Sequence, residues 1–153
     1  MPQQPAPPPP LPAPMADSKY GSAEKIMALG APELTALLKD SAASSYAKAK
    51  ACQRLAVVGD ARAVPALVPL LSDAQLSTYA RGALEQIPGA AADDALREAA
   101  MRLTGAQRVG VVHSIGKRRD RKAIEMLVKL RSGDDREAAN AADLALSRIR
   151  PVL

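Results

Sequence analysis

The sequence predicts an all-α fold built from about four tandem units of two helices each. Two observations carry this prediction: the chain repeats itself at an offset of 33 residues, and each repeat has apolar residues at helical spacing. No stretch of useful length alternates apolar and polar residues with the period of two that is typical of a strand. A period in this range is typical of repeat arrays, in which each unit rests on its neighbours.

The repetition is clearest between residues 32–48 and 65–81. In one register these segments share a first proline, a Leu-Leu pair, an aspartate and a Tyr-Ala pair that begins at Tyr46 and at Tyr79. Weaker copies follow, so the four units are expected to begin near residues 31, 61, 89 and 120. The drift in offset falls between helices, where loops absorb insertions.

Within each unit, the first helix is predicted from an apolar stripe and the second from an alanine-rich run whose small side chains allow close packing. Pro32 stands at a helix start, where its missing N–H is tolerated. Pro69 lies deeper and predicts a kink or a delayed start of its helix. Three aspartates follow the first stripes and are expected to cap the second helices: Asp40, Asp73 and Asp134.

Composition divides the chain into a tail or linker, residues 1–21, and a single repeat domain, residues 22–153. Eight of the first fourteen residues are proline, which favours extended polyproline II. The tail is interpreted as a tether or, alternatively, as a ligand for a polyproline-reading groove. It lacks the basic start and apolar run of a signal peptide, so we expect a cytoplasmic protein or a chain that begins inside a longer precursor. No stretch approaches the length of a membrane span.

The net charge of +5 is concentrated in one run, Lys117-Arg118-Arg119-Asp120-Arg121-Lys122, which contributes +4 (five positive residues and one negative). The run is expected between helices of the third and fourth units, where a charged segment is usually a solvated loop. The alternative is contact with phosphate or an acidic partner, because arginine forms bidentate bonds to such groups. With no Phe or Trp and only three Tyr, the chain lacks stacking platforms for single strands.

No pattern in the sequence indicates catalysis. His113 is the only histidine and Cys52 the only cysteine, so neither has a partner at metal-ligand or disulfide spacing. The pairs Asp93-Asp94 and Asp134-Asp135 stand at predicted helix starts and are interpreted as caps rather than as acid–base pairs. We therefore expect a protein that is not an enzyme and that holds no cofactor or metal.

The segments AVPALVPLLSD and YARGALEQIP, with their loose motif of leucine stripe, turn aspartate and Ala-x-x-Ala-Leu-x-x-Ile, resemble bacterial HEAT-like repeats, including the class first named for phycocyanobilin lyases. The resemblance covers residues 23–149. It implies a right-handed α-solenoid with the first helices on the convex side and the second helices lining the concave side. Family members mostly bind proteins, and some serve as lyase subunits or bind nucleic acid. Gly110, inside a second helix, departs from the pattern.

Tyr46 and Tyr79 recur at one place in two units, each followed two residues later by a basic residue. They are interpreted either as packed tyrosines or as a ridge of binding anchors, for which Tyr and Arg are favoured. The leading hypothesis is a non-enzymatic scaffold, alone or within a larger assembly, whose concave face binds an unidentified protein. The candidate contacts are Tyr46, Lys48, Tyr79, Arg81, Gln107 and Arg108. The alternatives are duplex nucleic-acid binding through Lys117, Arg118, Arg119, Arg121 and Lys122, or a bilin-chaperone subunit of a tetrapyrrole lyase.

Overall fold

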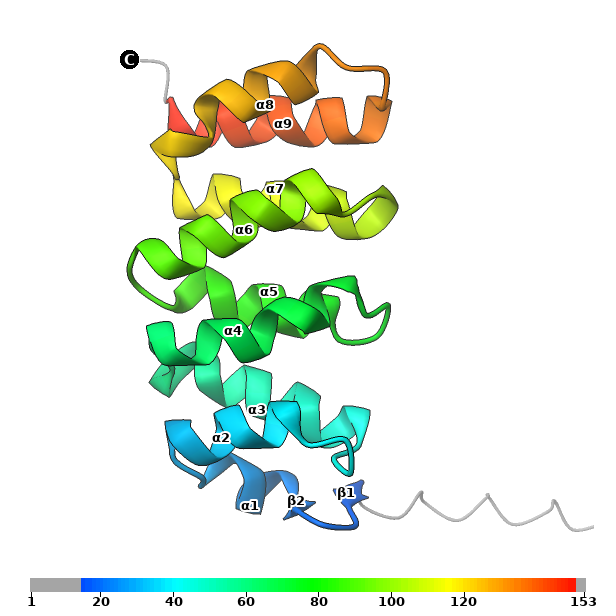
Figure 1. Ribbon diagram of the computed structural model, residues 1–153, viewed down its shortest axis with the longest axis vertical. Helices are drawn as coiled ribbons and strands as arrows, with labels where there is room; N and C mark the ends of the chain where they lie inside the picture. The colour runs from blue at the N-terminus through cyan, green and yellow to red at the C-terminus, as the bar shows by residue number, and fades with distance from the viewer. Residues whose placement is uncertain (1–14, 151–153) are drawn as a thin grey trace, which may run out of the picture.

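The computed structural model describes residues 15–150, which form helices and one small β-hairpin (Figure 1). The predicted all-α fold class is confirmed. The proline tract lies in residues 1–14, outside the described residues, as do residues 151–153. Within residues 15–150, no helix combines the length and the apolar character that crossing a membrane requires.

Four helix pairs follow one another along the chain. The first helices are α2 (Ala31–Lys39), α4 (Val64–Leu67), α6 (Ala90–Arg102) and α8 (Ile124–Arg131). The second helices are α3 (Ser45–Val58), α5 (Ser77–Gln86), α7 (Gly105–Arg118) and α9 (Arg136–Ile149). Short 3-10 helices flank α4 as η1 (Ala61–Ala63) and η2 (Val68–Ser72), and η3 (Arg121–Ala123) precedes α8. The pairs thus begin at residues 31, 61, 90 and 121, within one residue of the predicted starts.

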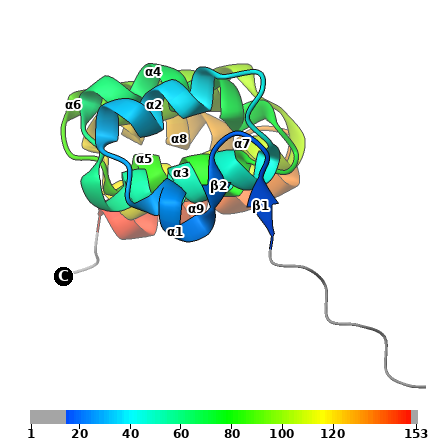
Figure 2. The same ribbon diagram turned by 90° about the horizontal axis from the view of Figure 1, so that it is seen from below.

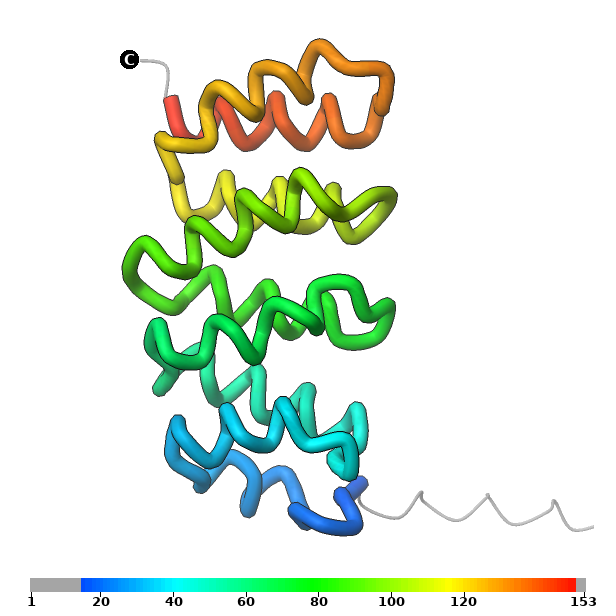
Figure 3. Tube along the Cα trace, viewed as in Figure 1, coloured from blue at the N-terminus to red at the C-terminus, as the bar shows by residue number. Residues whose placement is uncertain are grey.

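The pairs lie in two layers and are stacked in chain order. Seen end-on, α2, α4, α6 and α8 lie on one side, and α3, α5 and α9 on the other (Figure 2). The tube in Figure 3 advances along the long axis from the N-terminal hairpin to α9. In the second layer α3 packs on α5, α5 on α7 and α7 on α9, and these contacts are more extensive than those between successive first helices.

The core between the layers is aliphatic, as the composition requires. Leucines of the first helices, among them Leu34, Leu67, Leu96 and Leu127, have no exposed surface. Burial of one such side chain stabilises the fold by about 1.5–3 kcal/mol. The second helices α3, α5 and α9 also contribute buried alanines, such as Ala51, Ala80 and Ala142, whose small side chains let the helix backbones approach one another.

Two prolines break the first helix of the second pair. Pro65 stands in the first turn of α4 and Pro69 in the first turn of η2, where the α-helix gives way to 3-10 geometry. Pro69 cannot donate a backbone hydrogen bond to the preceding turn, so the regular ladder is interrupted there. The predicted disturbance at Pro69 is confirmed.

The aspartates after the first helices do not cap the second helices as predicted. Asp40 and Asp73 instead accept hydrogen bonds from backbone N–H groups within their own turns. The hydroxyl of Ser44 caps α3, and Asp135 rather than Asp134 caps α9. The prediction was wrong because the turns are long enough to have unpaired N–H groups of their own, and a nearby carboxylate binds these first.

The N-terminal hairpin covers the end of the stack. Strands β1 (Ala16–Asp17) and β2 (Gly21–Ser22) pair antiparallel and lead into α1 (Ala23–Met27), which packs on α3. Asp17 is buried, and its carboxylate accepts hydrogen bonds from the backbone N–H of Ser44 at 2.7 Å and of Tyr20 at 2.8 Å. Residues 16–21, which the sequence assigns to the tail, are therefore anchored to the start of α3.

Acid should weaken this anchor. Hydrogen bonds from the side chain and backbone of Ser44 hold the pKa of Asp17 well below its usual range, and hydrogen bonds from Lys19 and Tyr20 lower the pKa of Asp40 to about 2. Both folded pKa values lie below the unfolded value of about 3.9. Their stabilisation is therefore complete above that value and is lost as the pH falls towards about 2.

We expect urea midpoints of the wild-type chain to decrease between about pH 5 and pH 2, and Asp40→Asn to reduce this dependence. The asparagine keeps the shape of the side chain but no longer titrates. Glu33, which is exposed on α2, supplies the matched control Glu33→Gln. Equal pH dependence in wild type and Asp40→Asn would contradict the assignment.

Candidate functional site

A groove of about 400 Å³ lies between α3 and α5, and we call it the tyrosine groove. Its lining residues are Met15, Ser45, Tyr46, Ala49, Lys50, Gln53, Gln75, Leu76 and Tyr79. The two tyrosines that the repeat pattern singled out thus meet in one groove. Leu76 is buried in this lining, whereas Gln53 and Gln75 are exposed, so the groove offers both apolar surface and hydrogen-bonding side chains to a ligand.

Helix geometry explains which α3 residues line the groove. Tyr46, Lys50 and Gln53 are spaced i, i+4 and i+7, so they share one face of α3. The Lys50 ammonium lies 5.7 Å from the Tyr46 ring centroid and 3.3 Å from the Gln53 side-chain oxygen. Tyr79 on α5 is 40% exposed, so its ring is available for contact. The groove therefore combines two aromatic rings with side-chain hydrogen-bond donors.

The structure does not bring Lys48 and Arg81 into this groove. Each lies two residues after its tyrosine, which places it about 200° around the helix axis. The Arg81 guanidinium donates to the Gly110 carbonyl at 2.8 Å and lies 3.4 Å from the Ser114 hydroxyl, on α7. The predicted ridge is therefore not formed, because the tyrosines line the groove and the two basic residues do not. Arg81 instead links the second unit to the third.

This contact also accounts for Gly110. A Cβ atom at Gly110 would lie 2.6 Å from the central carbon of the Arg81 guanidinium. The glycine that departs from the repeat pattern leaves room for the arginine of the preceding unit to lie across α7.

Gln107 and Arg108, the remaining predicted contacts, lie on α7 and are half-buried. Arg108 donates to the Ala100 carbonyl at 3.0 Å and lines a second groove, of about 570 Å³, with Met101 and α8 residues including Met126. This groove is distinct from the tyrosine groove, which Arg108 does not line. The structure therefore does not unite the six candidate contacts in one site.

The basic run is not the loop that its charge predicted. Lys117 and Arg118 form the last turn of α7, Arg119 ends that helix with a left-handed φ of 54°, and Arg121 and Lys122 belong to η3. Helix α7 continues into the run because its apolar stripe persists to Ile115, one turn earlier. The prediction of a loop is thus wrong for the first half of the run.

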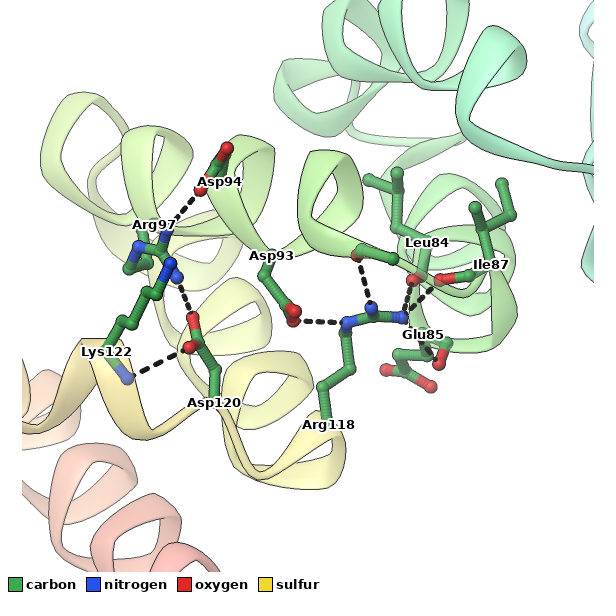
Figure 4. A network of polar contacts seen from close by, with 10 residues as sticks. Leu84, Glu85, Ile87, Asp93, Asp94, Arg97, Arg118, Asp120 and Lys122 are labelled. Carbon is green, nitrogen blue, oxygen red and sulfur yellow. Dashed lines mark hydrogen bonds and ion pairs between the residues drawn. The ribbon is translucent and has the colours of Figure 1, made fainter.

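Arg118 is bound inside the protein (Figure 4). Its guanidinium donates to the carbonyls of Leu84 at 2.8 Å and Ile87 at 2.6 Å, and to the Asp93 carboxylate at 2.6 Å. Further bonds reach the carbonyls of Glu85 and Gly89. The Leu84, Glu85 and Ile87 carbonyls lie at the C-terminal end of α5, where the last carbonyls of a helix have no donor within the helix, and Gly89 directly precedes α6. Arg118 thereby caps α5 and ties it to α6.

Asp120 and Arg97 form a second ion pair beside it. Asp120 is buried and pairs with Arg97, which also pairs with Asp94 (Figure 4). The same Asp120 carboxylate accepts from the backbone N–H of Lys122 at 3.1 Å and so caps η3. Lys117 lies 3.5 Å from Glu85. Among the cations of the run, Arg119, Arg121 and Lys122 have exposed side chains that form no ion pair with another described residue.

Cys52 and His113, which the sequence singled out, lie on different helices, α3 and α7. Cys52 is fully buried, and burial raises the pKa of its thiol to about 12. Burial, together with the positive charges of Arg81, Arg148 and Lys117, lowers the pKa of His113. Within residues 15–150, no group of three acidic, histidine or cysteine side chains is placed to hold a metal ion.

Sequence reasoning missed Lys50, Gln53, Gln75 and Met15 as groove residues. The first two could have been found, because they lie one and two helical turns beyond Tyr46. The other two belong to a turn and to the start of the described chain, and only the fold places them beside the tyrosines.

Comparison with models of known protein families and with curated proteins gave no match to this chain.

Proposed function

We propose that this chain is a non-enzymatic scaffold of HEAT-like repeats, a right-handed α-solenoid whose second helices line the concave side, and that it binds a protein partner at the tyrosine groove. The observation that carries the proposal is the convergence of Tyr46 and Tyr79 in one groove. Tyrosine is enriched among residues that dominate binding energy, because it offers a large rigid ring and a polar tip. The more extensive contacts between second helices support a stack that curves towards them.

The groove also favours a peptide-like partner over nucleic acid. Its polar lining residues include Lys50 and two neutral glutamines, Gln53 and Gln75, so the lining carries little positive charge. The basic run, the alternative site, has Arg118 committed to the α5 cap and Lys117 close to Glu85. Phosphate contacts need free cations, so the burial of Arg118 weakens the nucleic-acid hypothesis.

The proposal is tested by affinity capture with Tyr46→Ala and Tyr79→Ala variants followed by mass spectrometry. Loss of a tyrosine anchor weakens binding by about 2 kcal/mol, or roughly 30-fold, so proteins captured by the wild type should be lost from both variants. Leu144→Ala is the matched control, because Leu144 is an exposed apolar residue on α9, outside the groove. If the same proteins are retained by all three variants, the tyrosine groove is not the binding site.

A further inference from the structure

The tyrosine groove lies where the described chain begins. Met15 lines the groove and is 68% exposed. Two residues later, the buried Asp17 carboxylate binds the backbone N–H of Ser44, directly before α3. This anchor holds Met15, the first described residue, in the same groove as Tyr46.

The chemistry of the groove matches a proline-rich segment. Polyproline II has no internal hydrogen bonds, so its carbonyl groups accept from side-chain donors such as Lys50, Gln53 and Gln75. Its proline rings pack on aromatic side chains, which is how proline-rich peptides dock into aromatic-lined grooves. Tyr46 and Tyr79 supply those rings from two neighbouring helices.

The chain carries such a segment directly before Met15 in sequence. Residues 7–14 read PPPPLPAP and contain no charged side chain, so docking of this segment buries no charged group of its own. Four residues of polyproline II span about 12 Å, and packed helices lie about 8–10 Å apart. The segment is thus long enough to cross from α3 to α5 while it remains attached at Met15.

We propose that residues 7–14 of the same chain dock in the tyrosine groove and compete there with the protein partner. A proline-rich segment loses little conformational entropy on binding, because its extended form is preformed. The short connection gives the segment an effective concentration of about millimolar, so weak contacts suffice to occupy the groove. A partner must then displace the segment, which makes the groove self-regulated.

This inference rests on the groove of the proposed function, but its test needs no partner. A spin label is placed at Ala6→Cys of the full chain, and paramagnetic broadening of backbone amides is measured by NMR. Cys52 does not interfere, because it is fully buried and burial raises its thiol pKa to about 12, whereas the thiolate is the reactive form.

Docking predicts that the amides of Lys50, Gln53 and Tyr79 lose most of their intensity. Replacing Pro7, Pro8, Pro9 and Pro10 with serine should restore it, and this variant leaves every residue of the packed helices unchanged. Tyr79→Ala should restore the intensity as well, whereas Leu144→Ala should not.

Broadening that simply decreases with distance from Met15, or that persists in both the serine and Tyr79→Ala variants, would overturn the inference. So would broadening found only between labelled and unlabelled copies in a mixed sample, because the occupant would then be a second chain. If the groove amides are broadened but Tyr46→Ala and Tyr79→Ala capture the same proteins as the wild type, the proposed function alone is refuted. If the groove amides are not broadened but the two tyrosine variants lose the captured proteins, only self-docking is refuted.

Discussion

Arg118→Ala should lower the free energy of unfolding by about 3 kcal/mol. The side chain is 10% exposed, and its guanidinium binds the Leu84 and Ile87 carbonyls and the Asp93 carboxylate. Alanine leaves these acceptors without their donor. Removal of one partner of a buried charge-assisted hydrogen bond lowers stability strongly, because the other partner stays buried and unsatisfied. Urea unfolding followed by circular dichroism measures the change.

Two further variants sharpen this experiment. Arg118→Lys keeps the charge but lacks the planar fork, so it should recover only part of the lost stability. Arg121→Ala removes an exposed cation from the same run and should change the free energy of unfolding by less than about 0.5 kcal/mol. Equal effects of Arg118→Ala and Arg121→Ala would show that the run is a solvated segment after all.

The sequence predicts the exposed position of Arg121 but not the buried position of Arg118. A run of charges is typical of solvent-exposed loops, and the exposed half of this run follows that rule. Arg118 departs from it because its carbonyl acceptors lie 29–34 residues earlier in the chain. Backbone carbonyls carry no signature in the sequence, so a long-range helix cap of this kind follows only from the packing of α7 beside α5.

The helices themselves were predictable because their information is local. The starts near residues 31, 61, 89 and 120 follow from apolar periodicity, which the burial of Leu34 and Leu127 in one core reflects. Pro69 interrupts its helix through its own missing N–H, again a local cause. The turns were predicted less well, because the choice between Asp40 and Ser44 as a cap depends on how far each turn extends before the next helix begins.

The tyrosine groove was predicted in part, again from local information. Tyr46 and Tyr79 were identified by their repetition, and they do line one groove. Pairing each tyrosine with the basic residue two positions later neglected the rotation of the helix, which turns Lys48 and Arg81 to another side. Met15 could not be assigned at all, since its place depends on the buried Asp17 anchor.

Two glycines in second helices should respond to alanine with opposite signs. Gly82 lies inside α5, and a Cβ atom there would meet no other atom within 4 Å. Gly82→Ala should therefore raise the free energy of unfolding by about 1 kcal/mol, the ordinary gain from removing a glycine from a helix interior.

At Gly116 on α7, the same Cβ atom would lie 2.8 Å from the Cα atom and 2.9 Å from the Cβ atom of Ala145 on α9. These atoms belong to a helix rather than to a flexible side chain, so the two helices must separate. Gly116→Ala should lower the free energy of unfolding by about 2 kcal/mol, because overpacking outweighs the helix-propensity gain. Urea unfolding of both variants measures the two changes. If Gly116→Ala stabilised the chain as Gly82→Ala should, α7 and α9 would not be in close contact, and the tight packing of the second layer would be refuted.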